Sequence, residues 1–558
     1  MNKVKICEGV LESLPDDLRY LCWHRYPSKS LPVKFYPNHL VELDMSHSNL
    51  QHLWRDTKFL GNLRQIRLRG CEQLIEAPDL SGAPNLHVMY LDGCSNLTKF
   101  SKIPRNVKKL YLSRTAVEEI PSLRHSTSLQ TLYLGGCLNF SKFPQISRAI
   151  THLCLRETAI EEVPNSAIKP LNKLVFLDIS CNTRLKNLPT SMIHLTSLKI
   201  LRLNGCSNIT KFPQISGAIT ELYLSGTAIE EVPNSAIESL YKLVTLVISY
   251  NTRLKNLPSM SHLTYLETLR LGGCSYITEF PEISVGIVDL DLSGTAIEEI
   301  PSFVERFTNL EELTLDHCRS LKRVSSGIFK LKLRDASHCI SLETLPDTTV
   351  VSTGKLDISQ YFQYYNCLKL DVNAQTRIQL MANNVPETTS TSRRKNLIYW
   401  EKVNFCFPRS EIPDWVSYQN EGSSLTIDLP PHWYNNNFFG LVLCIVASCN
   451  SSDGGYSSVD CTCNFIDCDS QENICNLEIT HDKTTLEHPK LDHVFVKYSE
   501  SGEVDSSMYS LCQKVRFQFS PTNDCCKVKK CGVHLVYLEY KDESTESEDQ
   551  EEDSQNSE

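Results

Sequence analysis

One pattern, LxxLxLxx(C/N/T)xxLxxxP, recurs along the first 346 residues of the 558-residue chain. It reads LRQIRLRGCEQLIEAP from Leu63 and takes a shorter form, ITELYLSGTAIEEVP, from Ile219. A unit of this size cannot bury a hydrophobic core alone, so successive units must stack on one another. The fifteen units start 21 to 24 residues apart, at Leu18, Leu40, Leu63, Leu86, Val107, Leu129, Ile150, Leu174, Leu198, Ile219, Leu243, Leu266, Ile287, Leu310 and Leu331.

This period and pattern predict a leucine-rich-repeat solenoid. The LxLxx segment alternates with period two, which is typical of a short strand with one buried face. We therefore expect a parallel β ladder on the concave side. A proline closes most units and would stop a continuing helix, so the convex side should be mostly irregular or 3₁₀. The last unit has Arg334 in place of a leucine, and we interpret it as a cap.

The C/N/T position turns the chain away from each strand. Asn182 and Asn251 should hydrogen-bond to backbone there through the side-chain amide. Threonine fills the position in the short units, at Thr115, Thr158, Thr227 and Thr295. Cysteine should act there as a small buried thiol with weak hydrogen bonds, at Cys71, Cys94, Cys137, Cys206, Cys274, Cys318 and Cys339.

A block of three units is duplicated. THLCLRETAIEEVPNSAIKPL from Thr151 recurs 69 residues later as TELYLSGTAIEEVPNSAIESL from Thr220. The acidic pairs in such units, at residues 161–162, 230–231 and 298–299, are then copies of one solvent-exposed turn. We favour that interpretation over paired catalytic carboxylates.

Beyond the repeats, short apolar runs such as SLTIDL, KVRFQF and GVHLVYLEY alternate with polar turns, which favours an antiparallel β-sandwich. Phe407 and Trp415 are expected in its core, and Ser448 to Asn476 is interpreted as a long polar loop. The predicted organisation is a lead-in at 1–17, the repeat array at 18–346, a connector at 347–396, the sandwich at 397–540 and a disordered acidic tail at 541–558.

The net charge and the cysteine content exclude several classes of protein. The net charge is −10, and the tail contributes −8 of it, so the remainder lacks the basic surplus of a nucleic-acid binder. No secretory signal is recognised at the N-terminus, and the 23 cysteines are expected to be reduced thiols. The cysteines of the stretch Cys444 to Cys475 lack the spacing of a zinc knuckle, and Cys525, Cys526, Cys531 and His534 lie in or beside an expected strand, so no metal is expected at either group.

Several strings resemble plant TIR-NB-LRR disease-resistance receptors. LPDDLRYLCWHRYPSKSLPVKFYPNHLVELDMSHSNLQHLW from Leu14 resembles their first repeats, and GCSNLTKF and SGTAIEEIP resemble later ones. YFQYYNCLKLD from Tyr361 resembles the segment that follows the repeats. FCFPRSEIPDWVSYQNEGSS from Phe405 resembles the start of their post-repeat jelly-roll, immunoglobulin-like domain. The resemblance implies the recognition portion of an intracellular immune receptor, in the cytoplasm or nucleus.

The sequence departs from that family in one respect. It contains no GxxxxGK[ST] phosphate loop, and we expect no TIR or nucleotide-binding domain in this chain. Without these segments, or a Ser/His/Asp set or HExxH motif, we predict a protein that is not an enzyme and needs no cofactor. Neither nucleic acid nor membrane is an expected partner, and any oligomer would form through the absent domains.

The residue between the two strand leucines faces outward, so neighbouring repeats present a column of such residues. Aromatic and arginine residues in it are candidate anchors for a protein ligand, a pathogen effector or a guarded host protein. Tyrosine also suits any β surface, and the alternative function is a scaffold, an adaptor or a truncated receptor-like protein that binds a host protein. The candidate protein-binding residues are Arg67, Tyr90, Tyr111, Tyr133, Arg202, Tyr223 and Arg270.

Overall fold

The computed structural model divides into two compact units, residues 1–297 with 306–311, and residues 298–305 with 312–558. The predicted acidic tail and most of the predicted connector lie outside the residues that it describes. The described residues are 11–100, 102–324, 333–345, 361–376, 378–379, 404–435, 438–449, 459–466, 472–478, 491–500, 512–521 and 526–537.

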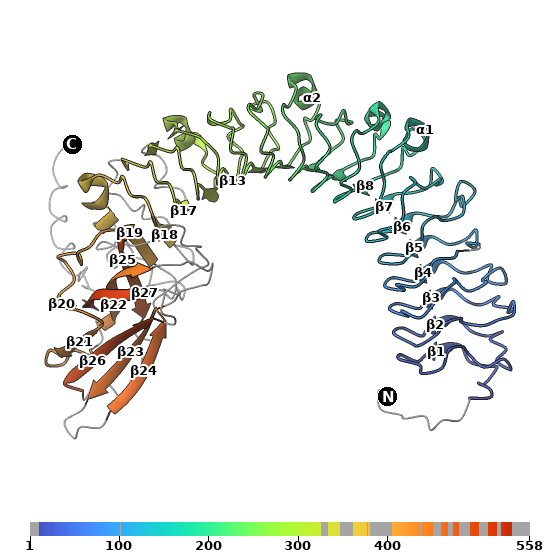
Figure 1. Ribbon diagram of the computed structural model, residues 1–558, viewed down its shortest axis with the longest axis horizontal. Coiled ribbons are helices and arrows are strands. Elements are labelled where there is room, and N and C mark those ends of the chain that lie inside the picture. Colours follow the sequence, from blue (N-terminus) through green and yellow to red (C-terminus); the bar gives the residue numbers. More distant parts are fainter. Residues whose placement is uncertain are drawn as a thin grey trace, which may run out of the picture. The chain divides into compact units, whose positions relative to one another are not determined.

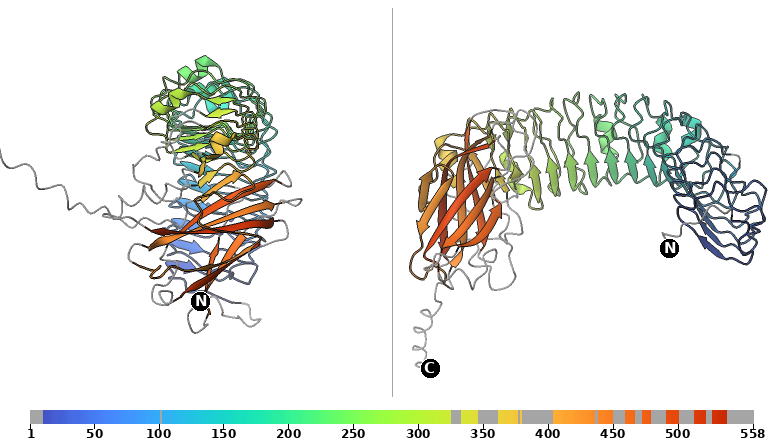
Figure 2. Two further views of the ribbon diagram at one scale, coloured as in Figure 1. Left: turned by 90° about the vertical axis from the view of Figure 1, so that its left-hand side faces the viewer. Right: turned by 60° about the horizontal axis from the view of Figure 1, so that its bottom comes forward.

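The first unit is a stack of repeats, each with one three-residue strand, and the strands line the inner side of its curve (Figure 1). Neighbouring strands pair in parallel and in register, as Figure 2 also shows. The middle residue of every strand is buried, as in Leu43 and Ile66. The strands are β1 Tyr20–Cys22, β2 Glu42–Asp44, β3 Gln65–Arg67, β4 Val88–Tyr90, β5 Lys109–Tyr111, β6 Thr131–Tyr133, β7 His152–Cys154, β8 Phe176–Asp178, β9 Ile200–Arg202, β10 Glu221–Tyr223, β11 Thr245–Val247, β12 Thr268–Arg270 and β13 Asp289–Asp291.

The segments opposite the strands are mostly irregular, with short helical turns. These are α1 Asn165–Ile168, η1 Thr190–His194, α2 Asn234–Glu238 and η2 Ser302–Arg306, of which η1 and η2 are 3₁₀. This agrees with the expected convex side of mostly irregular or 3₁₀ structure, to which α1 and α2 are two short exceptions. Pro164 and Pro233 are the N-caps of these helices. Proline is compatible with a helix start, where no N–H partner is needed, so it begins these turns rather than ending them.

The turn position works as the sequence predicts. Asn182 is fully buried, and its amide donates to the carbonyls of Leu155 at 2.8 Å and Ile179 at 2.7 Å. The Cys71 thiol donates to the carbonyl of Met45 at 3.2 Å. Burial raises the pKa of the Cys71 thiol to about 11, so it stays protonated and unreactive at neutral pH.

The duplicated block keeps its surface charges. Glu161 pairs with Arg184 at 3.3 Å, and Glu230 pairs with Arg253 at 3.4 Å, each with the next repeat. The carboxylates are more than half exposed. The acidic pairs of the repeats are thus copies of a solvated turn, as predicted, and exposed pairs of this kind stabilise little.

The second unit begins with further repeat strands and continues into the C-terminal domain. The strands β15 Glu312–Thr314, β17 Leu333–Asp335 and β18 Tyr361–Gln363 pair in parallel, and the predicted cap residue Arg334 lies in β17. Strand β18 then pairs in parallel with β19 Asn404–Pro408, the first strand of the C-terminal domain. A separate parallel pair joins β14 Glu299–Ile300 to β16 Arg323–Val324.

The C-terminal domain is an antiparallel β-sandwich. One sheet has the order β20-β27-β22-β25-β19 and the other β21-β26-β23-β24 (Figure 1). A shared hydrophobic core that includes Leu443, Phe465 and Phe517 fills the space between them. The remaining strands are β20 Tyr418–Glu421, β21 Ser424–Asp428, β22 Phe438–Cys449, β23 Val459–Ile466, β24 Glu472–Glu478, β25 Asp492–Glu500, β26 Lys514–Pro521 and β27 Cys526–Tyr537.

The structure differs from three of the predictions for this domain. Ser448 to Asn476 is not a long loop, because it contains β23 and the first part of β24, which pair with each other. Phe407 is fully buried as expected, whereas Trp415 is only partly buried. Not every thiol is reduced, since Cys526 is disulfide-bonded, although seventeen described cysteines are free. Adjacent antiparallel strands bring Cβ atoms within bridging distance, which spacing in the sequence cannot reveal.

Candidate protein-binding face of the repeat ladder

The register of the ladder places the first four predicted residues side by side. Arg67 is the partner of Tyr90, Tyr90 of Tyr111, and Tyr111 of Tyr133, on β3 to β6. Parallel strands lie about 4.8 Å apart, so identical positions in adjacent repeats are in contact distance. The last residue of each strand therefore contributes to one continuous column.

The three tyrosines contact one another through their rings. Tyr90 and Tyr111 are stacked with ring centroids 4.7 Å apart, and Tyr111 meets Tyr133 edge-on at 5.3 Å. All three are half-buried by these contacts, so the expectation that Tyr111 simply points to solvent needs correction. Burial raises the pKa of Tyr111 and of Tyr133, which keeps both phenols neutral and able to donate a hydrogen bond.

Two arginines flank this aromatic column. The Arg69 guanidinium lies 4.1 Å from the centroid of the Tyr90 ring, and that of Arg67 lies 5.6 Å from it. Arg67 is also paired with Glu42, and its distance to Asp44 is 3.8 Å. The arginines are thus held in place by cation–π contacts and carboxylates, at the edge of an uncharged aromatic surface.

A second group lies further along the column, after Cys154 and Asp178. The Arg202 guanidinium is sandwiched between Phe176 at 5.5 Å and Tyr223 at 5.1 Å. The structure thus brings Arg202 and Tyr223 together.

Arg270 stands apart from this group. Val247 separates it from Tyr223 in the ladder, and Asp289 holds it at 2.6 Å. Of the seven predicted residues, Arg67, Tyr90, Tyr111 and Tyr133 form one contact group and Arg202 and Tyr223 another.

Two contributing residues were missed by reasoning from the sequence. Arg69 lies two positions after Arg67, and Phe176 is the first residue of β8, where it also stacks with His152 at 6.1 Å. Both flank a buried leucine with the period-two spacing of a strand, so they face the same side as the chosen column. That alternation was the available signal, but only one position per repeat was considered.

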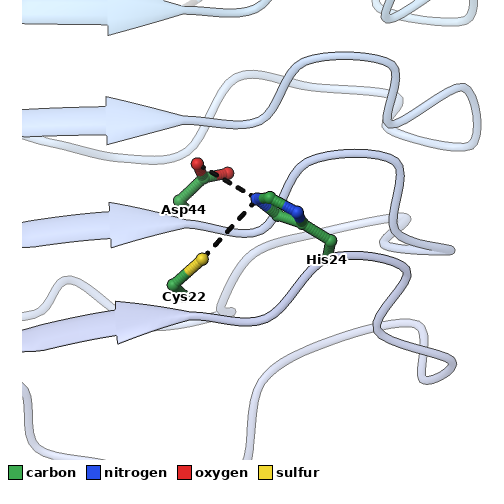
Figure 3. Close-up of side chains that lie close together, drawn as sticks. All are labelled: Cys22, His24 and Asp44. Atoms are coloured by element: carbon green, nitrogen blue, oxygen red, sulfur yellow. Dashed lines mark hydrogen bonds and ion pairs between the residues drawn. The ribbon is translucent and has the colours of Figure 1, made fainter. Parts of the chain in front are cut away.

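Clusters of metal-ligand residue types also occur among the described residues. Cys22, His24 and Asp44 lie together on β1, β2 and the turn after β1 (Figure 3). The Nε2 atom of His24 is 3.6 Å from the Cys22 sulfur and 3.2 Å from Oδ2 of Asp44. The same ring nitrogen therefore contacts both of the other residues. A second cluster is formed by Asp316, His317 and His338.

Several cysteines of the two groups considered for metal binding in the C-terminal domain are buried within strands. Cys531 is fully buried on β27, and Nδ1 of His534 is 2.8 Å from the Ser417 hydroxyl. Burial also lowers the pKa of His534. Cys461 and Cys463 are buried on β23, where their sulfur atoms are 3.8 Å apart.

Comparison with known proteins identifies relatives along most of the chain. Residues 407–544 match the C-JID domain family. Disease resistance-like protein DSC1 of Arabidopsis thaliana is 32% identical over 95% of this chain and 46% of its own length. The Arabidopsis thaliana protein SUPPRESSOR OF npr1-1, CONSTITUTIVE 1 is 30% identical over 86% of this chain and 32% of its own length. The chain carries a C-JID domain and is a homologue of plant disease resistance proteins.

This homology confirms the resemblance to TIR-NB-LRR disease-resistance receptors. The chain spans less than half the length of these curated relatives. Among solved structures, the functional domain of InlJ from Listeria monocytogenes aligns with 79% of this chain and 90% of its own, at 15% identity and a TM-score of 0.40. No helix among the described residues is long and apolar enough to cross a membrane.

Proposed function

We propose that this chain is the recognition portion of a plant disease-resistance receptor and that it binds a pathogen effector protein. The proposal places the contact on the column of Arg67, Tyr90, Tyr111 and Tyr133, together with the C-terminal domain. We propose that it acts inside the cell, in the cytoplasm or nucleus, and the same kinship with resistance proteins supports this.

The observation that supports a protein ligand is the aromatic column itself. Three consecutive repeats place tyrosine rings in contact, flanked by Arg67 and Arg69. Tyrosine and arginine are the residue types that most often dominate protein interfaces, because they bury large areas at little entropic cost. The rings are preorganised by their mutual contacts, so a ligand would not have to order them.

The same face favours a protein over a small molecule. Binding a small ligand usually requires a concave apolar pocket with a few convergent polar groups. The column is instead an extended ladder surface, which suits a macromolecular partner that contacts several repeats at once. Glu42 and Asp44 pair with Arg67 near one end of the column, so the surface is not the uniformly basic stripe that a nucleic acid would need.

The alternative is a scaffold that holds a host protein through the same ladder. Both functions use the same surface, and only the kinship with resistance proteins favours effector recognition. The identity of the partner distinguishes them.

Biolayer interferometry with the immobilised full chain against purified pathogen effectors and host proteins provides the test. Saturable binding of an effector, weakened by Tyr90→Ala or Tyr111→Ala, supports the proposal. Binding of host proteins alone supports the scaffold. Binding of an effector that is unaffected by every substitution in the ladder contradicts the proposed surface.

A further inference from the structure

Three potential metal ligands meet at two adjacent repeat turns of the second unit. Asp316 and His317 follow β15, and His338 follows β17. One ligand atom from each residue lies within 4.8 Å of the other two. The two histidines occupy the same turn position in their repeats, each with a φ of 59°, so stacking of the repeats superimposes them. Their ring centroids are 4.2 Å apart.

The spacing of these ligands suits a small divalent ion. Oδ2 of Asp316 is 2.7 Å from Nδ1 of His317, and Oδ1 of Asp316 is 3.5 Å from Nδ1 of His338. Tetrahedral Zn²⁺ with bonds of about 2.0–2.1 Å places its ligand atoms about 3.4 Å from one another. These two separations start from different oxygens of Asp316, and the two imidazole rings are stacked, so the 31% exposed His317 side chain would have to rotate out of the stack to bring its nitrogen onto the same ion as His338.

His338 provides the second, independent observation. Its side chain is only 3% exposed, and neither ring nitrogen makes a hydrogen bond. Oδ1 of Asp316, which faces it, is also buried without a hydrogen bond. A buried polar atom that makes no hydrogen bond is costly, by about 1–3 kcal/mol, and the 3.5 Å ion-pair contact between Nδ1 of His338 and Oδ1 of Asp316 offsets only part of that cost. A bound cation would satisfy both atoms at once.

The surroundings hold His338 in one orientation. Its ring meets that of Tyr365 edge-on at 5.5 Å, and Tyr365 in turn stacks with His493 of β25 at 4.4 Å. Nε2 of His493 accepts a hydrogen bond from the backbone N–H of Asn366 at 3.0 Å. An imidazole fixed by packing is a preorganised ligand, because little side-chain entropy is lost when the metal binds.

We propose that Asp316, His317 and His338 form a binding site for a divalent transition-metal ion of the zinc type. Two imidazoles and one carboxylate are a donor set that zinc accepts, with the fourth position left to water or another ligand. The side chains of Asp316 and His317 are 30% and 31% exposed, which gives the ion an entry path. Since ligands come from successive repeats, the ion would bind the turns together and stabilise the end of the repeat array.

The cluster of Cys22, His24 and Asp44 offers a matched control rather than a second proposal. His24 is 48% exposed and its Nε2 atom already contacts both partners (Figure 3). It therefore lacks the buried, unsatisfied nitrogen that distinguishes His338.

Cobalt titration of the full chain tests the site directly. The chain, without a histidine tag and stripped with EDTA, is titrated with Co²⁺ while the visible d–d absorption is recorded, and Zn²⁺ is then added as a competitor. The expected result is saturable absorption from one tetrahedral ion, which Zn²⁺ abolishes. His338→Ala and Asp316→Asn should each weaken Co²⁺ binding at least tenfold, and His24→Ala should leave it within twofold.

Several results would overturn the proposal. The first is a wild-type chain that shows no saturable absorption. The second is a loss of binding with His24→Ala but not with His338→Ala. If His338→Ala fails to fold by circular dichroism, Asp316→Asn decides, because the amide keeps the shape of a half-exposed side chain. Undiminished binding by a folded Asp316→Asn variant would then exclude the site.

Discussion

Replacing Asn182 with alanine tests the physical role of the turn position in the ladder. The Asn182 amide donates to the carbonyls of Leu155 and Ile179, and its Oδ1 accepts from the Thr158 hydroxyl at 2.7 Å. Asn182 is fully buried, so water cannot replace these partners. Three lost hydrogen bonds at about 1 kcal/mol each predict a local destabilisation of about 3 kcal/mol.

Other repeats of the chain provide comparisons for the same turn position. Asn251 makes the equivalent bonds in the duplicated block, to Leu224 at 2.9 Å and Ile248 at 2.6 Å, so Asn251→Ala should cost the same. Cysteine fills this position in other repeats, where Cys206 donates to the Ile179 carbonyl at 3.2 Å. Asn182→Cys should therefore retain one bond and lose less than Asn182→Ala.

Hydrogen exchange followed by mass spectrometry is the appropriate assay, because a repeat array does not unfold as one unit. About 3 kcal/mol corresponds to roughly hundredfold faster exchange of the amides in peptides spanning residues 150–182, relative to the wild type. Exchange within threefold of the wild type would refute the account of the turn. So would equal effects of the alanine and cysteine variants.

Three further outcomes follow from the structure. Arg184→Ala should change the local stability of its repeat by less than about 0.5 kcal/mol in the same hydrogen-exchange assay, because its pair with Glu161 is exposed; a larger loss would contradict that assignment. Burial lowers the pKa of His493 to about 4, so the stabilising effect of keeping it neutral is complete above about pH 6.5 and is lost as the pH falls towards 4. His493→Gln should flatten that part of the stability profile, measured by urea denaturation between pH 4 and 7, and an unchanged slope would exclude His493 as its cause. The chain should not bind ADP in calorimetry, since its sequence contains no GxxxxGK[ST] phosphate loop; stoichiometric ADP binding would overturn this.

The repeats were predictable because their signal is redundant. The same leucine spacing recurs along the array, and a shift by one residue would expose every leucine of a strand such as Leu43 or Leu110. The outward column was therefore correct in phase. The side-chain contacts of this column were not predictable. Arg67 pairs with Glu42 and Arg69 lies over the Tyr90 ring, and both contacts depend on side-chain conformation.

The C-terminal domain was harder to predict from residues alone. In the stretch from Ser448 to Asn476 the polar residues dominate by number, and they hide the alternation of Val459, Cys461, Cys463 and Phe465 towards the core. The cluster of Asp316, His317 and His338 was also missed. His338 lies 21 residues after His317, and only the stacking of turns brings them together.

The central claim, that the tyrosine column binds the ligand, is tested most directly by the dissociation constant of Tyr111→Ala for the effector. This variant loses ring contacts with Tyr90 and Tyr133, worth about 0.5–1.5 kcal/mol each, yet it should remain folded because its backbone pairing is unchanged. Tyr241→Ala removes a 56% exposed tyrosine outside the strands and serves as the control. We predict that Tyr111→Ala weakens binding by about 1–2 kcal/mol, roughly five- to thirtyfold, with Tyr241→Ala within twofold of the wild type. A folded Tyr111→Ala variant with the wild-type dissociation constant would contradict the claim.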